Sequence, residues 1–137
     1  MDRKHELLKR VPLFSGLSGA ALEEIDRLAD EVAVPEGRDL VRQGAFAHEF
    51  FLVLDGEVEV ERDGRPIATL GAGDFVGEIA LVDGGTRTAT VRTTRPSRLL
   101  VLGHREFNTL MADFPDVRIG VLEALAKRVR RLEPDAT

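Results

Sequence analysis

The chain has 137 residues, of which 43% are hydrophobic and 31% are charged, a composition typical of a soluble globular protein with one domain. It carries a net charge of −5 and no cysteine, which excludes disulfides, zinc–thiolate sites and thiol chemistry and argues against nucleic acid as the main partner. No apolar run approaches the roughly 20 residues that span a bilayer, and the charged N-terminus lacks the apolar core of a signal peptide. We therefore expect a cytoplasmic protein with no membrane segment.

Two helices are predicted at the N-terminal end. The first covers residues 1–12 and ends at Pro12, because the residue before a proline is disfavoured in the helical region. The second covers residues 19–30, with Ser18 as its N-cap. Its apolar face repeats at helical spacing and consists of Leu22, Ile25, Leu28 and Ala29.

Residues 31–102 show the pattern of short strands separated by turns. Apolar or alternating stretches occur at 32–34, 40–44, 50–54, 58–60, 67–70, 90–93 and 99–102. Asp-Gly pairs at 55–56 and 63–64 are typical of hairpins, and Gly-Ala-Gly-Asp at 71–74 predicts another turn. Short strands with Gly-rich turns indicate an antiparallel β-barrel or jelly roll.

The segment 75–91, FVGEIALVDGGTRTATV, contains the one predicted non-strand insertion in this barrel. Gly77 lacks a Cβ and lets the backbone approach a ligand, and a short helix after it would offer unpaired N–H groups to an anion. Arg87 carries a planar fork of donors that suits phosphate oxygens, whereas ionised Glu78 accepts hydrogen bonds and suits a sugar hydroxyl. The combination predicts a cyclic nucleotide site. The alternative is a surface ion pair between Glu78 and Arg87, which would contribute little to stability.

The C-terminal part returns to helix, with one helix at 105–112, an interruption at Phe114-Pro115 and a longer helix at 116–132. The longer helix has an apolar stripe, formed by Val121, Leu122, Leu125, Val129 and Leu132. Packing on the barrel is the first interpretation of this stripe, and homodimerisation is the second. A basic cluster on the same helix, Lys127, Arg128, Arg130 and Arg131, is interpreted as a solvated face near the helix C-terminus.

The sequence contains no pattern of a catalytic or metal centre. His5, His48 and His104 are dispersed without metal-ligand spacing, and Gly-x-Ser-x-Gly is absent. We expect no catalytic residue, no metal and no cofactor. A metal-dependent enzyme of the cupin type, which shares the jelly-roll fold, is an alternative function.

The pattern Phe-x-Gly-Glu-x-Ala-Leu, a Gly-rich turn and Arg-Thr-Ala-Thr-Val resembles the phosphate-binding cassette of the cyclic nucleotide-binding domain family. This family includes kinase regulatory subunits, cyclic nucleotide-gated channels and bacterial cAMP-responsive activators. The resemblance implies that Glu78 binds the ribose 2′-hydroxyl and that Arg87 binds the exocyclic phosphate oxygens. It also implies supporting ligand contacts from Gly77, Ile79, Ala80, Thr88 and Ala89, and from Ile67 on the preceding strand.

The resemblance covers essentially the whole chain as one domain. It implies a mainly β (α+β) fold, in which N-terminal helices at 1–30 precede a jelly roll at 31–102 that contains the cassette at 75–91. C-terminal helices at 104–132 follow, and the last of them acts as a lid that brings a residue such as Leu125 or Arg128 over the purine.

The function implied is a sensor that couples cyclic nucleotide binding to movement of the C-terminal helix and acts on a protein partner in trans. The ligand is cAMP or cGMP. Thr88 is compatible with both, and the ratio of 16 Arg to 3 Lys hints at a GC-rich bacterial genome and favours cAMP. The alternative is a protein-interaction module of the same fold that binds no nucleotide.

Overall fold

The computed structural model describes residues 14, 16–45, 49–76 and 89–132, with side chains up to residue 127. The predicted helix at 1–12 lies outside this part of the chain. Two compact units are present, one formed by residues 1–27 with 108–137 and the other by residues 28–107.

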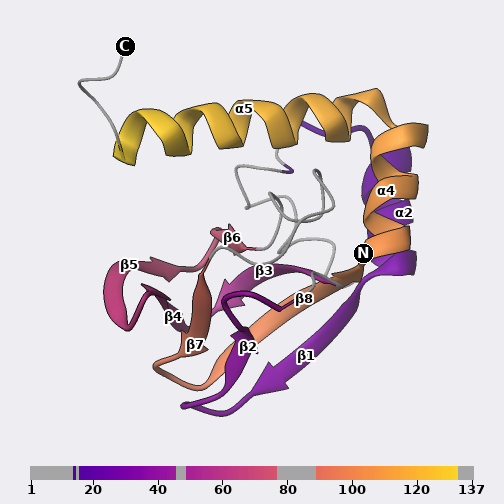
Figure 1. Ribbon diagram of the computed structural model, residues 1–137. Helices are drawn as coiled ribbons and strands as arrows, with labels where there is room; N and C mark the ends of the chain where they lie inside the picture. The colour runs from indigo at the N-terminus through magenta and orange to yellow at the C-terminus, as the bar shows by residue number, and fades with distance from the viewer. Residues whose placement is uncertain (1–13, 15, 46–48, 77–88, 133–137) are drawn as a thin grey trace. The chain divides into compact units, whose positions relative to one another are not determined.

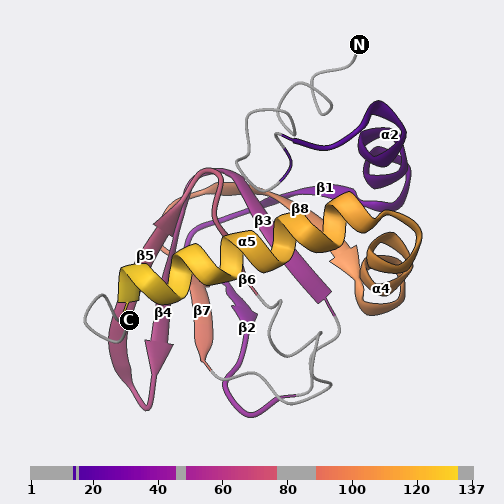
Figure 2. The same cartoon turned by 90° about the horizontal axis from the view of Figure 1, so that it is seen from above.

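The unit at 28–107 is built from two antiparallel four-stranded sheets, which confirms the predicted jelly roll (Figures 1 and 2). One sheet has the order β1-β8-β3-β6 and the other the order β2-β7-β4-β5. The strands are β1 (Asp30–Val34), β2 (Asp39–Val41), β3 (Glu49–Asp55), β4 (Glu57–Arg62), β5 (Arg65–Gly71), β6 (Phe75–Val76), β7 (Thr90–Thr93) and β8 (Ser97–Gly103).

The inner faces of the two sheets share one hydrophobic core. Each sheet contributes four buried side chains to it: Phe51, Val53, Val76 and Leu99 from one, and Val41, Val58, Leu70 and Val91 from the other. The central strand β3 is buried along both faces, which explains why its sequence is a continuous apolar run instead of an alternating one. Its second face includes Phe50, whose ring stacks on Phe75 and Phe107 with centroid distances of 5.8 and 4.9 Å.

The two Asp-Gly pairs have different structural roles. Asp63 and Gly64 both have positive φ, 54° and 78°, and they close the hairpin in which Arg62 pairs with Arg65. The hairpin predicted at Asp55-Gly56 is wrong, because β3 and β4 belong to different sheets. Gly56, with φ of 113°, carries the chain from one sheet to the other.

The other unit is helical within the residues described. α2 (Gly19–Leu28) begins as predicted, since Ser18 Oγ accepts a hydrogen bond from the N–H of Ala21 at 3.2 Å. It ends at Leu28, two residues earlier than predicted, because β1 begins at Asp30. The predicted C-terminal helices are α4 (His104–Asp113), which spans the unit boundary, and α5 (Pro115–Leu132).

The N-terminal ends of α2 and α5 are joined inside this unit. Asp116, in the first turn of α5, accepts a hydrogen bond from the backbone N–H of Ser18 at 3.1 Å. On α5, Val121 is buried and Leu122 is 59% exposed, and the choice between packing on the barrel and homodimerisation for the apolar stripe stays a prediction. No helix in the described part of the chain is long and apolar enough to cross a membrane.

Candidate functional site

The structure describes the two ends of the predicted ligand-binding segment, up to residue 76 and from residue 89 onward. Six of the eight predicted ligand residues, Gly77, Glu78, Ile79, Ala80, Arg87 and Thr88, lie outside the described residues. Ala89 is buried directly before β7, and Ile67 lies on β5 with an exposed fraction of 48%. Because β4 separates β5 from β7, the structure does not place Ile67 and Ala89 on neighbouring strands.

Ile67 occupies an irregularity in the β4–β5 pair. Val60 pairs with Ala68 and Glu61 pairs with Pro66, so Ile67 is the extra residue between two registered positions. Extra residues of this kind redirect a side chain and bend a strand. The predicted contact of Ile67 with the base or ribose stays a prediction.

The turn that leads into the 75–91 segment is held by the centre of the opposite strand. Asp74 N–H donates to Gly71 O at 3.0 Å, and Asp74 Oδ2 accepts from Gly71 N–H at 3.0 Å. Gly73, with φ of 92°, donates to Val53 O at 2.8 Å, and Val53 N–H donates to Asp74 O at 2.8 Å. Two main-chain bonds to β3 therefore fix the direction in which the chain enters β6.

The first two residues of the segment continue this anchoring. Phe75 and Val76 form β6 at the edge of the first sheet, where they pair with Leu52 and Phe51. Both side chains are buried, and the Phe75 ring stacks on Phe50. The chain thus leaves the first sheet at Val76, a residue whose side chain is buried and whose backbone is paired with β3.

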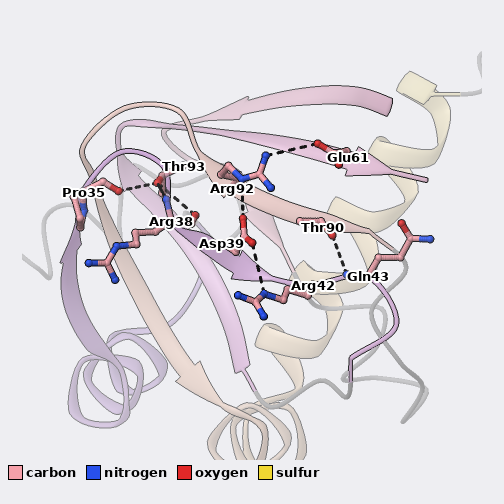
Figure 3. Close-up of polar contacts among 9 residues, drawn as sticks. All are labelled: Pro35, Arg38, Asp39, Arg42, Gln43, Glu61, Thr90, Arg92 and Thr93. Atoms are coloured by element: carbon pink, nitrogen blue, oxygen red, sulfur yellow. Dashed lines mark hydrogen bonds and ion pairs between the residues drawn. The ribbon is translucent and has the colours of Figure 1, made fainter. Parts of the chain in front are cut away.

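The segment returns to the structure inside the second sheet. β7 is an interior strand there, flanked by β2 and β4, and its first residue Thr90 pairs with Glu61. Thr90 Oγ1 also accepts a hydrogen bond from Gln43 N–H at 3.0 Å (Figure 3). The segment therefore connects an edge strand of one sheet to an interior strand of the other.

Charged side chains join β2, β7 and β4 on the exposed surface of the second sheet (Figure 3). Arg92 Nε donates to Asp39 Oδ1 at 2.7 Å, and Arg92 also lies 3.8 Å from a carboxylate oxygen of Glu61. Asp39 additionally meets Arg42 at 3.5 Å. The hydrogen bond to Asp39 and its negative charge raise the pKa of Arg92, so this cation stays charged at every working pH.

The far end of β7 is fixed by a buried hydroxyl. Thr93 is 1% exposed, and its Oγ1 donates to Pro35 O at 2.7 Å and accepts from Arg38 N–H at 2.9 Å (Figure 3). Its backbone also exchanges bonds with the turn before β2, from Gly37 N–H at 2.8 Å and to Arg38 O at 2.9 Å. β7 is thus held along its whole length.

Sequence reasoning did not assign a role to the residues that hold this frame. Asp74 ends a Gly-rich turn and its carboxylate accepts from the N–H three residues earlier, so the sequence predicted the turn but not this hydrogen bond. Gln43 and Thr90 are 47 residues apart, and no local signal connects them. Within the described ranges, no group of three His, Cys, Asp or Glu side chains is arranged to hold a metal ion.

Comparison with known proteins supplies independent support for the resemblance. Residues 31–114, from β1 to the residue after α4, match the family described as cyclic nucleotide-binding domain. A cyclic nucleotide-gated potassium channel from Rhizobium etli is 37% identical over 115 residues, which cover 84% of this chain and 32% of the channel.

Two solved structures share the fold at detectable sequence identity. The catabolite activator protein of Thermus thermophilus superposes with a TM-score of 0.80 at 29% identity, covering 90% of this chain and 61% of that chain. The regulatory domain of PKA from Toxoplasma gondii, in a co-crystal with cAMP, superposes with a TM-score of 0.72 at 27% identity, covering 80% of this chain and 46% of that chain.

This chain spans about a third of the length of the Rhizobium etli channel. The family match covers more than half of its 137 residues, including β2 to β8 and β1 from its second residue onward. The chain belongs to the cyclic nucleotide-binding domain family.

Proposed function

We propose that this chain is a sensor that binds a cyclic nucleotide, cAMP in preference to cGMP, through the cassette at 75–91. The observation that carries the proposal is the family match over residues 31–114, which contains the whole cassette and the strands at both of its ends. The Glu and Arg that the family pattern requires are both present, at Glu78 and Arg87.

The described residues hold both ends of the cassette, which supports the proposal. The chain enters the cassette from a position bonded to β3 and leaves it into a strand held by β2 and β4, so both ends are fixed before any ligand binds. A pre-organised site loses less conformational entropy on binding, which favours affinity. Because the chain has a net charge of −5, a local arrangement and not the overall field must attract the phosphate.

In this proposal Arg87 and backbone N–H groups bind the phosphate, and Glu78 binds the ribose 2′-hydroxyl. Gly77, Ile79, Ala80 and Ala89 shape the backbone around them. Thr88 contacts the phosphate or the purine, and Ile67 contacts the base or the ribose. The choice of cAMP agrees with the co-crystallised ligand of the Toxoplasma gondii regulatory domain.

The proposed output is a movement of the C-terminal helix α5 that a protein partner detects in trans. A ligand shifts such an equilibrium only by as much as it binds one helix position better than the other. We assign no catalytic step to the chain, because a sensor needs only this difference in affinity.

The test is a calorimetric titration of purified chain, checked to be free of co-purified nucleotide, with cAMP and with cGMP at the same ionic strength. Saturable one-to-one binding with a lower Kd for cAMP is the expected result. A lower Kd for cGMP would reverse the proposed base preference, but the proposal of a cyclic nucleotide sensor would stand. Absence of both heat and thermal stabilisation with either nucleotide would overturn the proposal in favour of a protein-interaction module.

A further inference from the structure

Gln43 joins three segments that are far apart in the sequence. Its backbone N–H donates to Thr90 Oγ1 at 3.0 Å, at the first residue of β7. Its side-chain Oε1 accepts from the N–H of Asp63 at 2.9 Å, and its Nε2 donates to Asp63 Oδ1 at 2.8 Å, in the turn between β4 and β5. One residue thus connects the end of β2, the start of β7 and the β4–β5 hairpin.

The geometry of this residue is fixed from several sides. Gly44 follows it with φ of 85°, and Ala45 N–H donates to Arg42 O at 3.1 Å, so Gln43 sits in a hydrogen-bonded turn whose third position requires positive φ. Its amide has one productive orientation, because a flip would place the amino group against an N–H and the oxygen against a carboxylate.

Asp63 is itself constrained. Among the described residues it is the only non-glycine with positive φ, a conformation that Asp and Asn tolerate better than other side chains do. Both its N–H and its carboxylate contact Gln43. The hairpin turn therefore offers Gln43 a rigid partner.

The bond to Thr90 lies where the main-chain ladder ends. The register between β2 and β7 ends at Val41 and Val91, and the next contact between the two segments is Gln43 N–H with the Thr90 hydroxyl. On its other side Thr90 pairs with Glu61 of β4. The first residue of β7 is thus held by both neighbouring strands, and on the β2 side by a side chain.

We infer that Gln43 and Thr90 are positioning residues for ligand binding, because they fix the point at which the cassette rejoins the sheet. Arg87 precedes Thr90 by three residues, which span at most about 11 Å of extended chain, so a displacement of Thr90 is transmitted to the proposed phosphate ligand over a short distance. The inference rests on the proposed function, in which Arg87 binds the phosphate.

The contacts of Gln43 with Thr90 and Asp63 should contribute to the free energy of ligand binding about as much as one or two hydrogen bonds do. All three side chains are partly or largely exposed, so water can replace a lost partner and the fold should survive. The loss should appear in ligand binding, because a less firmly attached cassette end loses more conformational entropy when its Arg87 binds phosphate. We expect cAMP affinity to fall about three- to tenfold when the link is broken.

Four variants of the full chain test the inference by calorimetric titration with cAMP. Thr90→Val removes the acceptor at constant shape, and Thr90→Ser keeps it. Gln43→Glu places a carboxylate against the Asp63 carboxylate, and the double variant Gln43→Glu/Asp63→Asn restores a donor–acceptor pair. Thr69→Val, at an exposed position of β5, is the matched control.

The expected result is weaker binding for Thr90→Val and Gln43→Glu, with near-normal affinity for Thr90→Ser, the double variant and Thr69→Val. A purely structural role would change the melting temperature in this order but would leave the affinity for cAMP the same in all variants. In an Arg87→Ala background, where NMR titration can follow weak binding, Thr90→Val should cause no further loss.

Two outcomes would overturn the inference. Unchanged affinity of Thr90→Val, in a protein whose unmodified form binds cAMP, would leave the proposed function standing and remove the positioning role. A full additional loss in the Arg87→Ala background would show that the link acts independently of the phosphate. Failure of the unmodified chain to bind either cyclic nucleotide would overturn the proposed function and this inference together.

Discussion

The hydroxyl of Thr93 donates a 2.7 Å hydrogen bond to the carbonyl oxygen of Pro35, a residue 58 positions earlier in the chain. The same oxygen accepts from Arg38 N–H, so one buried side chain satisfies a donor and an acceptor of the turn between β1 and β2. This turn connects strands of different sheets, which makes Thr93 a link between the two layers of the jelly roll.

Thr93→Val should therefore destabilise the fold. Valine has the shape of threonine but cannot form hydrogen bonds with Pro35 O and Arg38 N–H, and the loss of a partly buried hydrogen bond costs about 0.5–1.5 kcal/mol. Urea unfolding followed by circular dichroism measures the change, with Thr69→Val as the exposed control. Equal stability of the two variants would contradict the role of the hydroxyl.

Gly56 should tolerate no side chain. A Cβ built there would lie 2.7 Å from Ser97 Cα, a backbone atom that cannot give way, and its φ of 113° is unfavourable for other residues. Gly37 is the control that separates the cost of the backbone conformation from the cost of the steric clash. It has a φ of 85° but no atom within 4 Å of its Cβ position. Gly37→Ala should cost about 1–2 kcal/mol for the backbone conformation alone.

Gly56→Ala should cost a further 1–3 kcal/mol or more, about the usual cost of an overpacked site. Denaturant unfolding of the two variants provides the comparison. If both lose the same stability, the close approach of Ser97 is not what requires glycine at position 56.

Removal of the Arg87 guanidinium should weaken cAMP binding strongly. Truncating one partner of a desolvated charge pair costs about 2–5 kcal/mol of binding free energy, whereas the fold should be retained. Calorimetry measures the loss, and Arg105→Ala, an exposed residue in the first turn of α4, is the control. Wild-type affinity in the Arg87→Ala variant would exclude a phosphate contact.

Glu78→Gln should reduce affinity less than Arg87→Ala, because the amide still offers one acceptor to a hydroxyl. The ribose assignment has its own test, which compares cAMP with its 2′-deoxy analogue in both proteins. The analogue should bind unmodified protein more weakly and should lose little further affinity in Glu78→Gln. Glu36→Gln, in the exposed turn after β1, controls for the change of charge. Equal losses on the analogue in both proteins would refute the ribose contact.

The Glu24–Arg27 pair on α2 gives a prediction for pH. Arg27 Nε donates to Glu24 Oε2 at 3.3 Å, and hydrogen bonding from Arg27, with its charge as a lesser cause, holds the pKa of Glu24 below its ordinary value. A lowered pKa means that the folded state favours the ionised form. Its contribution to stability is therefore present above the ordinary glutamate pKa and disappears as the pH falls through the lowered value.

Arg27→Met should raise the pKa of Glu24 toward its ordinary value, which NMR titration of the side-chain carboxyl can follow. The stability difference between this variant and the unmodified chain should vanish in acid. It should also vanish in a Glu24→Gln background, and its persistence there would assign the effect to another partner of Arg27.

Most local elements of this protein could be predicted from the sequence, because they depend on periodicity and turn chemistry. The alternation around Val58 predicted β4, the Asp63-Gly64 pair predicted the hairpin that follows, and Ser18 predicted the start of α2. The cassette pattern at 75–91 carried the family resemblance, which the match over residues 31–114 confirmed.

The way in which these elements combine could not be predicted from local patterns. Asp55-Gly56 has the same local pattern as Asp63-Gly64, yet it crosses between sheets, because β3 pairs with β6 and β8 instead of β4. Leu122 fits the apolar stripe of α5 by spacing but is exposed. Gln43 and Thr90 meet because β2 and β7 are adjacent in the second sheet, although 47 residues separate them. Strand order and such long-range contacts follow from burying both sheets in one core, a requirement of the whole chain that no local pattern encodes.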